Sequence, residues 1–427
     1  MADSSGMAPE DNVYGEHLPP QVRDLSIIGT YRGRCVFLTG ATGFVGKVVL
    51  EKLLRSCPDV KRVYVLVRPR KDQTPDARMR EEILGSEIFT TLRSKRPDFD
   101  AFCTDKLVAV AGELTANHVG ISESDREMLY DNVNIIIHCA AVVDFNERLD
   151  RAIELNAMGS LRMLEIGKKC KNIGAFLHVS TCYVNSNRAN GLIEEKVYPL
   201  GFDPEEMVER VRKMPPSELE NIATTGLLHS WPNTYTMTKA MTEQLLIKHR
   251  GDIPLVICRP SIVGSAWSEP VPGWVDVVSA AGAVYIAVGM GVVKFLPGSP
   301  QNVGDVIPVD YVSNAIIAAV PAVFEKRGKY FICHAASSSE NPMPWEYPLN
   351  VVKQFFQRHP PPRAIGPVEF NFVPSPQAYQ LRFLLQYSLP ASILKTLALV
   401  GTDSYKAKAQ QFEKLLWYVP SSRLIFC

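Results

Sequence analysis

The sequence predicts an α/β fold, a doubly wound parallel sheet followed by a partial C-terminal helical domain. Apolar runs alternate with helical patterns through the first half of the chain, which is typical of βα units on a parallel sheet. A glycine-rich turn lies where the first apolar run meets the first helical pattern. After about Tyr330 this alternation ends, and a stretch rich in proline and aromatic residues, 342–374, leads to a helical region over 376–416.

The expected strands are apolar nearly throughout, as strands are when helices cover both faces of a sheet. They span residues 34–39, 62–67, 107–111, 134–139, 175–180 and 254–258. The expected helices of this region span residues 43–56, 148–169 and 235–249. In the last of them, apolar side chains recur at helical spacing: Met237, Ala240, Met241, Leu245 and Leu246.

The chain divides into three expected parts: a polar N-terminal leader over 1–30, an α/β domain over 31–340 and a partial helical domain over 341–427. An insertion interrupts the α/β domain over 187–232, where the pattern breaks into charges, prolines and polar turns. Within it we expect only a short charged helix, over 204–213.

The composition is that of an ordinary globular protein, with 46% hydrophobic and 21% charged residues. The net charge is only +1 and the basic residues are scattered, which argues against a nucleic-acid partner. Nine cysteines without paired short spacings indicate reduced thiols in an intracellular protein, and we expect no metal site. The first 20 residues lack a basic start and an apolar stretch, so we expect no secretory signal.

The longest uncharged run, over 277–293, is near the lower limit for a membrane-spanning helix. It is diluted by Gly282, Gly289 and Gly291. We therefore expect a buried or surface-docked segment, and at most a peripheral contact of the protein with a lipid surface.

The glycine-rich turn predicts a dinucleotide site. Gly40 suits the tight turn, Gly43 lets backbone N–H groups approach a pyrophosphate, and Gly46 lets helix and strand pack closely. The N-terminus of the following helix attracts phosphate charge. The expected cofactor contacts at this turn are Gly40, Thr42, Gly43, Phe44, Val45 and Gly46.

The residue after the second expected strand indicates which dinucleotide binds. An NAD site would carry an acidic residue there, whereas Arg68 is basic and its planar guanidinium suits a ribose 2′-phosphate. The sequence therefore favours NADPH. The alternative is that Arg68 belongs to an exposed basic loop, since Arg70 and Lys71 follow it.

Tyr235 and Lys239 lie four residues apart and thus on one face of a helix. A nearby ammonium should lower the pKa of the phenol, and such a tyrosine can give a proton to a carbonyl oxygen as hydride reaches the carbon. Upstream, Ser180 and Thr181 close a strand, and either hydroxyl could bind the same oxygen. We favour Thr181; the alternative is that one hydroxyl only caps the strand end.

Together these residues resemble the extended short-chain dehydrogenase/reductase superfamily, which has a Rossmann fold. The resemblance implies that Tyr235 is the acid, that Lys239 also holds the nicotinamide ribose, and that a Ser or Thr orients the substrate. The separation of Thr181 from Tyr235 is longer than usual, and the insertion accounts for it. Further positions that match cofactor-site stretches of the superfamily are Asn156, Cys139, Ala140, Ala141, Pro260, Ile262 and Val263.

Within the superfamily, the chain is most similar to the fatty acyl-CoA reductases. The similar stretches cover 34–345 and keep the family's order: residues 40–47, 137–145, 178–185, 272–274 and 307–312. The tail resembles part of the family's C-terminal helical domain through Leu389-Pro390-Ala391 and an expected helix over 405–416, and the resemblance implies a shortened form of that domain.

The resemblance implies reduction of a long-chain fatty acyl-CoA, with NADPH, through an aldehyde to a primary alcohol. The run over 277–293, with Trp267 and Trp274, is the expected wall for the acyl chain, and core packing is the alternative.

Three other functions stay open: a thioester reductase that releases the aldehyde, a sterol or sugar dehydrogenase, and a non-catalytic scaffold that binds acyl-CoA and NADPH. The resemblance also implies membrane association at the peroxisome or endoplasmic reticulum. A cytoplasmic protein and a homo-oligomer both stay open.

Overall fold

A parallel sheet forms the centre of the protein, whose computed structural model describes residues 26–188, 191–219, 226–278, 280–362, 364–390 and 392. The seven strands follow the order β10-β6-β5-β4-β1-β2-β3, and each neighbouring pair is parallel. The strand order reverses between β1 and β4, which is where α/β proteins bind ligands. The strands are β1 Cys35–Thr39, β2 Arg62–Val67, β3 Leu107–Ala111, β4 Val133–His138, β5 Ala175–Val179, β6 Leu255–Pro260 and β10 Tyr330–Ala335.

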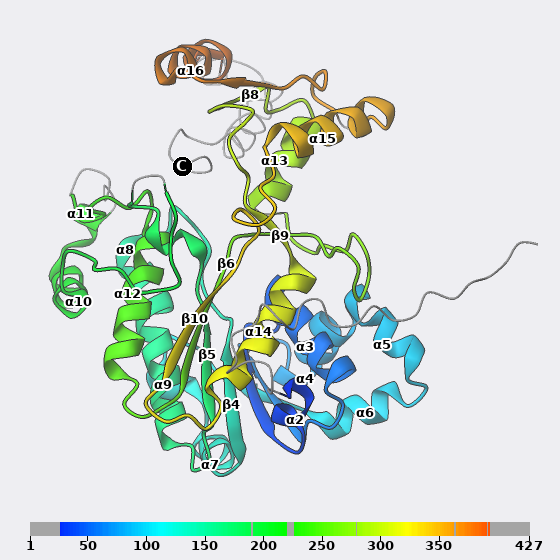
Figure 1. Ribbon diagram of the computed structural model, residues 1–427, viewed down its shortest axis with the longest axis vertical. Coiled ribbons are helices and arrows are strands. Elements are labelled where there is room, and N and C mark those ends of the chain that lie inside the picture. The colour runs from blue at the N-terminus through cyan, green and yellow to red at the C-terminus, as the bar shows by residue number, and fades with distance from the viewer. Residues whose placement is uncertain are drawn as a thin grey trace, which may run out of the picture.

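Helices cover both faces of this sheet (Figure 1). On one face, α3 Phe44–Ser56 and α14 Val309–Val323 pack against β1 and its neighbours. On the other face lie α7 Glu123–Asn132, α9 Gly159–Lys169 and α12 Thr234–His249. The strands bury both faces, which confirms the predicted doubly wound α/β class.

Shorter helices fill the connections of the α/β region. They are α2 Ile27–Tyr31, α4 Pro75–Arg78, α5 Thr90–Lys95, α6 Phe99–Lys106, α8 Leu149–Ala152, α10 Pro204–Lys213 and α11 Pro216–Leu219. Two π-helical segments span Met79–Leu84 and Ile153–Met158. Single 3₁₀ turns span Glu87–Phe89, Asn117–Gly120 and Cys182–Asn185.

One strand of the sheet was not predicted from the sequence. Tyr330–Ala335 forms β10 and pairs in parallel with β6, so the expectation that the βα alternation ends at about Tyr330 is wrong by one strand. The physical reason is that β10 is an edge strand, on which Tyr330 and Phe331 are exposed, and no helix of the same layer follows it. Its burial pattern therefore lacks the continuous apolar run of the central strands.

A second, smaller lobe lies beyond one end of the sheet, at the top of Figure 1. Its parallel strand pair joins β8 Phe295–Pro297 to β11 Asn371–Val373. Its helices are α13 Ala280–Gly289, α15 Glu346–Arg358, α16 Pro376–Phe383 and a π-helical segment Leu384–Ser388. The lobe has its own apolar core, which includes Val288, Phe295, Leu296, Trp345, Leu349, Tyr379 and Tyr387.

This core joins residues from both sides of the domain boundary predicted at 340, because α13 and β8 pack against α15 and α16. The division into domains stays a prediction. The uncharged run over 277–293 includes α13, which has 10 residues. In the part of the chain that the structure describes, no helix combines the length and apolarity needed to cross a membrane.

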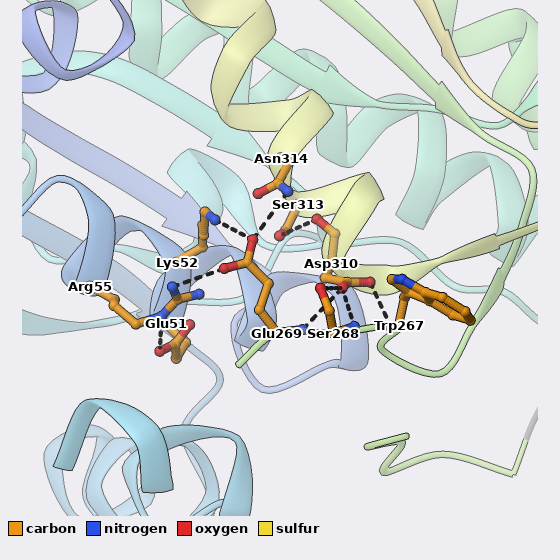
Figure 2. A network of polar contacts seen from close by, with 9 residues as sticks. All are labelled: Glu51, Lys52, Arg55, Trp267, Ser268, Glu269, Asp310, Ser313 and Asn314. Atoms are coloured by element: carbon orange, nitrogen blue, oxygen red, sulfur yellow. Dashed lines mark hydrogen bonds and ion pairs between the residues drawn. The ribbon is translucent and has the colours of Figure 1, made fainter. Parts of the chain in front are cut away.

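A loop over 265–278, here called the linker loop, connects the α/β region to α13. It follows the short strand β7 Ile262–Gly264, which pairs with β9 Val306–Pro308. The buried carboxylate of Asp310, at the start of α14, accepts hydrogen bonds from the backbone N–H groups of Trp267, Ser268 and Glu269 at 2.9–3.2 Å (Figure 2). This side chain fixes the beginning of the linker loop.

Ion pairs tie the same loop to α3. Glu269 accepts from Arg55 at 2.9 Å and from Lys52, and the amide of Asn314 on α14 donates to it at 3.3 Å (Figure 2). At the other end of the loop, the Lys47 ammonium lies 2.5 Å from the Asp276 carboxylate. Helix α3, which begins at the glycine-rich turn, therefore holds the linker loop near both of its ends.

Several predictions fall on parts of the chain beyond the described residues. These are most of the leader over 1–30, residues 189–190 and 220–225 of the insertion, and the expected helix over 405–416. The predicted helix over 204–213 is confirmed as α10. The cysteines in the described part of the chain are all free thiols.

Candidate active site

A cavity of about 790 Å³ lies at the carboxyl ends of the central strands. It is bordered by the glycine-rich turn, by the segments that follow β2, β4, β5 and β6, and by the start of α12. The predicted site residues that border it are Gly40, Thr42, Gly43, Phe44, Val45, Gly46, Arg68, Cys139, Ala140, Ala141, Ser180, Thr181, Tyr235, Lys239, Pro260, Ile262 and Val263. The fold therefore brings these distant parts of the sequence to one place.

Close packing explains the glycines of the turn. Gly40 has a φ of +76°, and a Cβ there would lie 2.8 Å from the backbone nitrogen of Ala140. A Cβ on Gly46 would collide with the Gly40 carbonyl. Gly43 is the N-cap of α3 and offers no side chain to cap it, so the helix N-terminus faces the cavity with its backbone donors. This arrangement fits an anionic group such as a pyrophosphate.

Three arginines lie at one end of the cavity: Arg68, Arg70 and Arg78. Arg68 forms an ion pair with Glu113 at 2.5 Å and is largely exposed. Arg78 is buried and donates to the Arg68 carbonyl at 2.7 Å. The sequence analysis missed Arg78 and Glu113 because neither directly follows the glycine-rich turn or β2. This end of the cavity carries more positive than negative side chains and suits a phosphate.

Tyr235 borders the cavity from the first turn of α12, which Asn233 caps through a 2.9 Å bond to the backbone N–H of Thr236. Burial raises the pKa of Tyr235 to about 12, and a hydrogen bond with the Thr181 hydroxyl acts in the opposite direction. The prediction that Lys239 lowers this pKa is therefore wrong. The reason is geometric, because the Lys239 ammonium points toward β5.

Lys239 is buried, and its ammonium donates to the Val179 carbonyl at 2.7 Å. Its Nζ lies 3.5 Å from Nε2 of His178, which is also buried. Burial lowers the pKa of Lys239 to about 8, and the charge of Glu243 opposes this shift. At neutral pH this site therefore holds a protonated phenol beside a cation that gives up its proton easily.

The two candidate hydroxyls have different partners. The Ser180 hydroxyl donates to a Glu243 carboxylate oxygen at 2.5 Å, so it is occupied within the protein. Thr181 contacts Tyr235 and also accepts from the backbone N–H of Tyr183 at 3.3 Å, as the cap of the 3₁₀ turn. The preference for Thr181 stays a prediction, because this hydroxyl also caps the 3₁₀ turn, as the alternative expected.

Three predicted residues do not border the cavity. Asn156 is buried behind it, where its amide oxygen accepts from the Val142 backbone N–H at 2.9 Å. Trp274 packs on Phe44 with 5.6 Å between ring centroids, and Trp267 is 70% exposed. The prediction that both tryptophans form the wall for the acyl chain is therefore wrong, since Trp274 is in the core and Trp267 faces solvent. Among the described residues of the predicted run, Val277 and Ala281 border the cavity.

Other side chains of the cavity were missed from the sequence, because nothing in their spacing marks them. Val143 and Phe145 follow β4, and the Phe145 ring lies 5.7 Å from the ring of Tyr235. Ser261 and Ser186 also border the cavity, and their hydroxyl oxygens are buried and have no hydrogen-bond partner among the described residues.

Comparisons with known proteins agree with this geometry. Residues 38–316 match the family described as Male sterility protein. The chain is 38% identical to Fatty acyl-CoA reductase 1 of Mus musculus, over 86% of this chain and 70% of that protein. It is 32% identical to Probable fatty acyl-CoA reductase 5 of Arabidopsis thaliana, over 92% and 86% respectively.

Solved structures share the fold. The terminal R domain from the myxalamid PKS-NRPS biosynthetic pathway has a TM-score of 0.58 and 22% identity, covering 93% of this chain and 83% of that one. A reductase domain of a nonribosomal peptide synthetase from Mycobacterium tuberculosis has a TM-score of 0.56 and 18% identity, over 91% and 89%. At these identities the similarity concerns the fold alone.

Proposed function

This chain belongs to the fatty acyl-CoA reductase family, and we propose that it reduces a long-chain fatty acyl-CoA with NADPH, through the aldehyde, to a primary fatty alcohol. The observation that carries the proposal is the meeting of Tyr235, Thr181 and Lys239 with the glycine-rich turn around one cavity. One cavity would thus bring a proton donor and a helix end suited to a phosphate to the same substrate and cofactor.

The protein binds a nicotinamide cofactor, and we propose that the cofactor is NADPH. The pyrophosphate would bind at the N-terminus of α3, where Gly43 caps the helix without a side chain, and the close packing of Gly40 and Gly46 holds the turn against the strands. Arg68, with Arg78 supporting its backbone, would hold the 2′-phosphate. Glu113 pairs with Arg68 and would give way to the phosphate.

When bound, the nicotinamide supplies a hydride to the carbonyl carbon. Tyr235 would give its proton to the carbonyl oxygen, and the Thr181 hydroxyl would hold that oxygen beside the phenol. A pKa of about 12 keeps the phenol protonated at neutral pH, which is the state that a proton donor needs.

The same residues would serve twice. The first reduction gives a hemithioacetal that loses coenzyme A and leaves an aldehyde, and the second reduces that aldehyde. Lys239 would hold the nicotinamide ribose and return a proton toward Tyr235, a role that its pKa of about 8 suits. Asn156 would keep the backbone after β4 in position through its bonds to Val142.

The acyl chain would follow the apolar side of the cavity, between Val143 and Phe145 of the α/β region and Val277 and Ala281 at the lobe. These residues take the role that the sequence analysis gave to Trp267 and Trp274.

A fatty acyl-CoA and NADPH are the only partners that we propose for the reaction, which would take place inside the cell. Attachment to a peroxisomal or reticular membrane surface, and association into a homo-oligomer, stay predictions.

The test is incubation of the purified chain with NADPH and a long-chain acyl-CoA, with product analysis by mass spectrometry. We expect NADPH oxidation and a primary alcohol as the released product. Accumulation of aldehyde would favour the aldehyde-releasing reductase. Binding of NADPH without oxidation would favour the scaffold.

A further inference from the structure

The catalytic face of α12 continues one turn beyond Lys239. Tyr235, Lys239 and Glu243 follow one another at intervals of four residues and so share one face of the helix. Glu243 is 2% exposed, although a carboxylate is rarely so deep in a protein without a partner. The sheet behind α12 provides that partner.

Arg259 of β6 forms a bidentate ion pair with the Glu243 carboxylate, in which Nε lies 2.9 Å from Oε1 and Nη2 lies 2.6 Å from Oε2. Both side chains are almost completely removed from water. A buried pair of this kind lasts only when its remaining hydrogen-bonding groups are also satisfied. The third bond to the carboxylate comes from the Ser180 hydroxyl, at 2.5 Å.

Arg259 also contacts the insertion and the edge strand β10. Its Nη2 donates to the Lys196 carbonyl in the insertion at 3.0 Å, and its Nη1 lies 3.2 Å from Nε2 of His334 on β10. The pair therefore joins α12, the end of β5, β6, the edge strand and the insertion in one buried network. A change at Glu243 can reach the cavity by two routes, through Ser180 and through Lys239.

Building on the proposed function, we propose that Glu243 is a positioning residue for the reduction. It fixes Ser180, and with it the adjoining Thr181 hydroxyl, and its carboxylate places a negative charge one helical turn from Lys239. Arg259 holds the carboxylate in place for both tasks.

The surroundings of Lys239 single out Glu243 as the acting charge. His178 from β5 and His138 from β4 pack nearby, and burial lowers the pKa of both, to about 3 for His138. Both imidazoles are therefore neutral at neutral pH. Cys139, at the end of β4, has a pKa raised by burial to about 12 and is a neutral thiol. The two groups that raise the Lys239 pKa are Glu243 and Cys139, and because the thiol is neutral, the Glu243 carboxylate is left as the acting group.

The direct test is an NMR titration of the Lys239 side chain in the full chain, in the wild type and in Glu243→Gln. We expect the pKa of Lys239 to fall by about one unit in the variant, and the alkaline limb of the kcat profile to move to lower pH by the same amount. Glu243→Asp keeps the charge and should restore the limb. An unchanged Lys239 titration in a folded Glu243→Gln protein would overturn this part.

Ser180→Ala tests the other route and leaves the ion pair intact. We expect kcat to fall roughly 10- to 100-fold with little change in KM for NADPH, because Thr181 loses its fixed position. Thr242→Val is the matched control, since Thr242 is equally buried on α12 and bonds only to its own helix, at the Thr238 carbonyl. If Ser180→Ala and Thr242→Val had equal activity, the proposal would be contradicted. This comparison can be made even if the Glu243→Gln protein does not fold.

If the wild-type protein did not reduce acyl-CoA, the proposed function would be wrong, and the role of Glu243 would not be decided by activity. The NMR titration would still decide the effect of Glu243 on Lys239, because it needs no turnover.

Discussion

The two sides of the cavity are built in different ways. On the cofactor side, buried strand ends and the start of α3 position backbone groups and the Tyr235–Thr181 pair. On the acyl side, the linker loop and α13 contribute Val277 and Ala281, and side-chain ion pairs at Lys47 and Glu269 hold that loop. Strand ends held by a sheet are rigid, whereas a loop held by partly exposed ion pairs can shift. We infer that the chemistry is fixed by the sheet and that substrate fit is adjusted at the loop.

The largest effect should come from the cofactor side, at Tyr235. Tyr235→Phe removes the proton donor and leaves the ring against Phe145, so kcat should fall by about 10²- to 10⁴-fold. NADPH binding, measured by fluorescence titration, should stay near the wild-type value because the glycine-rich turn is unchanged. Turnover close to that of the wild type would exclude Tyr235 as the acid.

A smaller effect is expected at the arginine end of the same side. Arg68→Ala should weaken NADPH by about 1.5–3 kcal/mol, the value of a lost charge-assisted hydrogen bond, and should leave NADH almost unchanged. Arg62→Ala is the matched control, because Arg62 is an exposed arginine at the opposite end of β2. Equal weakening of both cofactors by Arg68→Ala would show that the 2′-phosphate binds elsewhere.

On the acyl side, we expect a change in substrate affinity rather than in chemistry. Lys47→Met breaks the ion pair with Asp276 and releases the end of the linker loop next to Val277. KM for acyl-CoA should rise by a few-fold, on the order of 1 kcal/mol, while kcat changes less. Asp276→Asn should have the same effect, and the double variant should add little to either. Independent, additive effects would mean that the pair does not hold the loop.

The smallest effect concerns stability in acid. Burial opposes ionisation of Glu269, but Lys52, Asn314 and Arg55 outweigh it and lower its pKa to about 2. The pKa of a glutamate in the unfolded chain is about 4.3. The Glu269 ion pairs therefore contribute fully to folding stability above that pH, and the contribution is lost as the pH falls toward about 2. Glu269→Gln should therefore reduce Tm above about pH 5 but not near pH 2. A constant difference in Tm over this range would contradict the assignment.

The sequence predicted the cofactor side better than the acyl side, and the reason is physical. The strands β2 and β3 match their predicted bounds, because a buried parallel strand needs a continuous apolar run that the sequence displays. The glycine-rich turn was equally clear, since Gly40 and Gly46 leave no room for a side chain. Such local requirements leave a mark in the sequence.

Features that depend on tertiary contacts could not be predicted from the sequence in this way. The pKa of Tyr235 depends on where the Lys239 ammonium points, and spacing on a helix does not fix that direction. Trp267 and Trp274 looked like cavity walls, but one is exposed and the other packs in the core. The burial of Glu243 could not be predicted from the sequence either, because the sheet brings its partner Arg259 from a distant part of the chain.

The most direct test of the central claim follows the hydrogen that the cofactor delivers. The purified chain would be given a long-chain acyl-CoA and NADPH carrying deuterium at the transferred position, and the product would be analysed by mass spectrometry. We predict a primary alcohol with two deuterium atoms on its hydroxyl-bearing carbon, since one site performs both reductions. An aldehyde with one deuterium, or a product without deuterium, would contradict the reduction of acyl-CoA to alcohol by this chain.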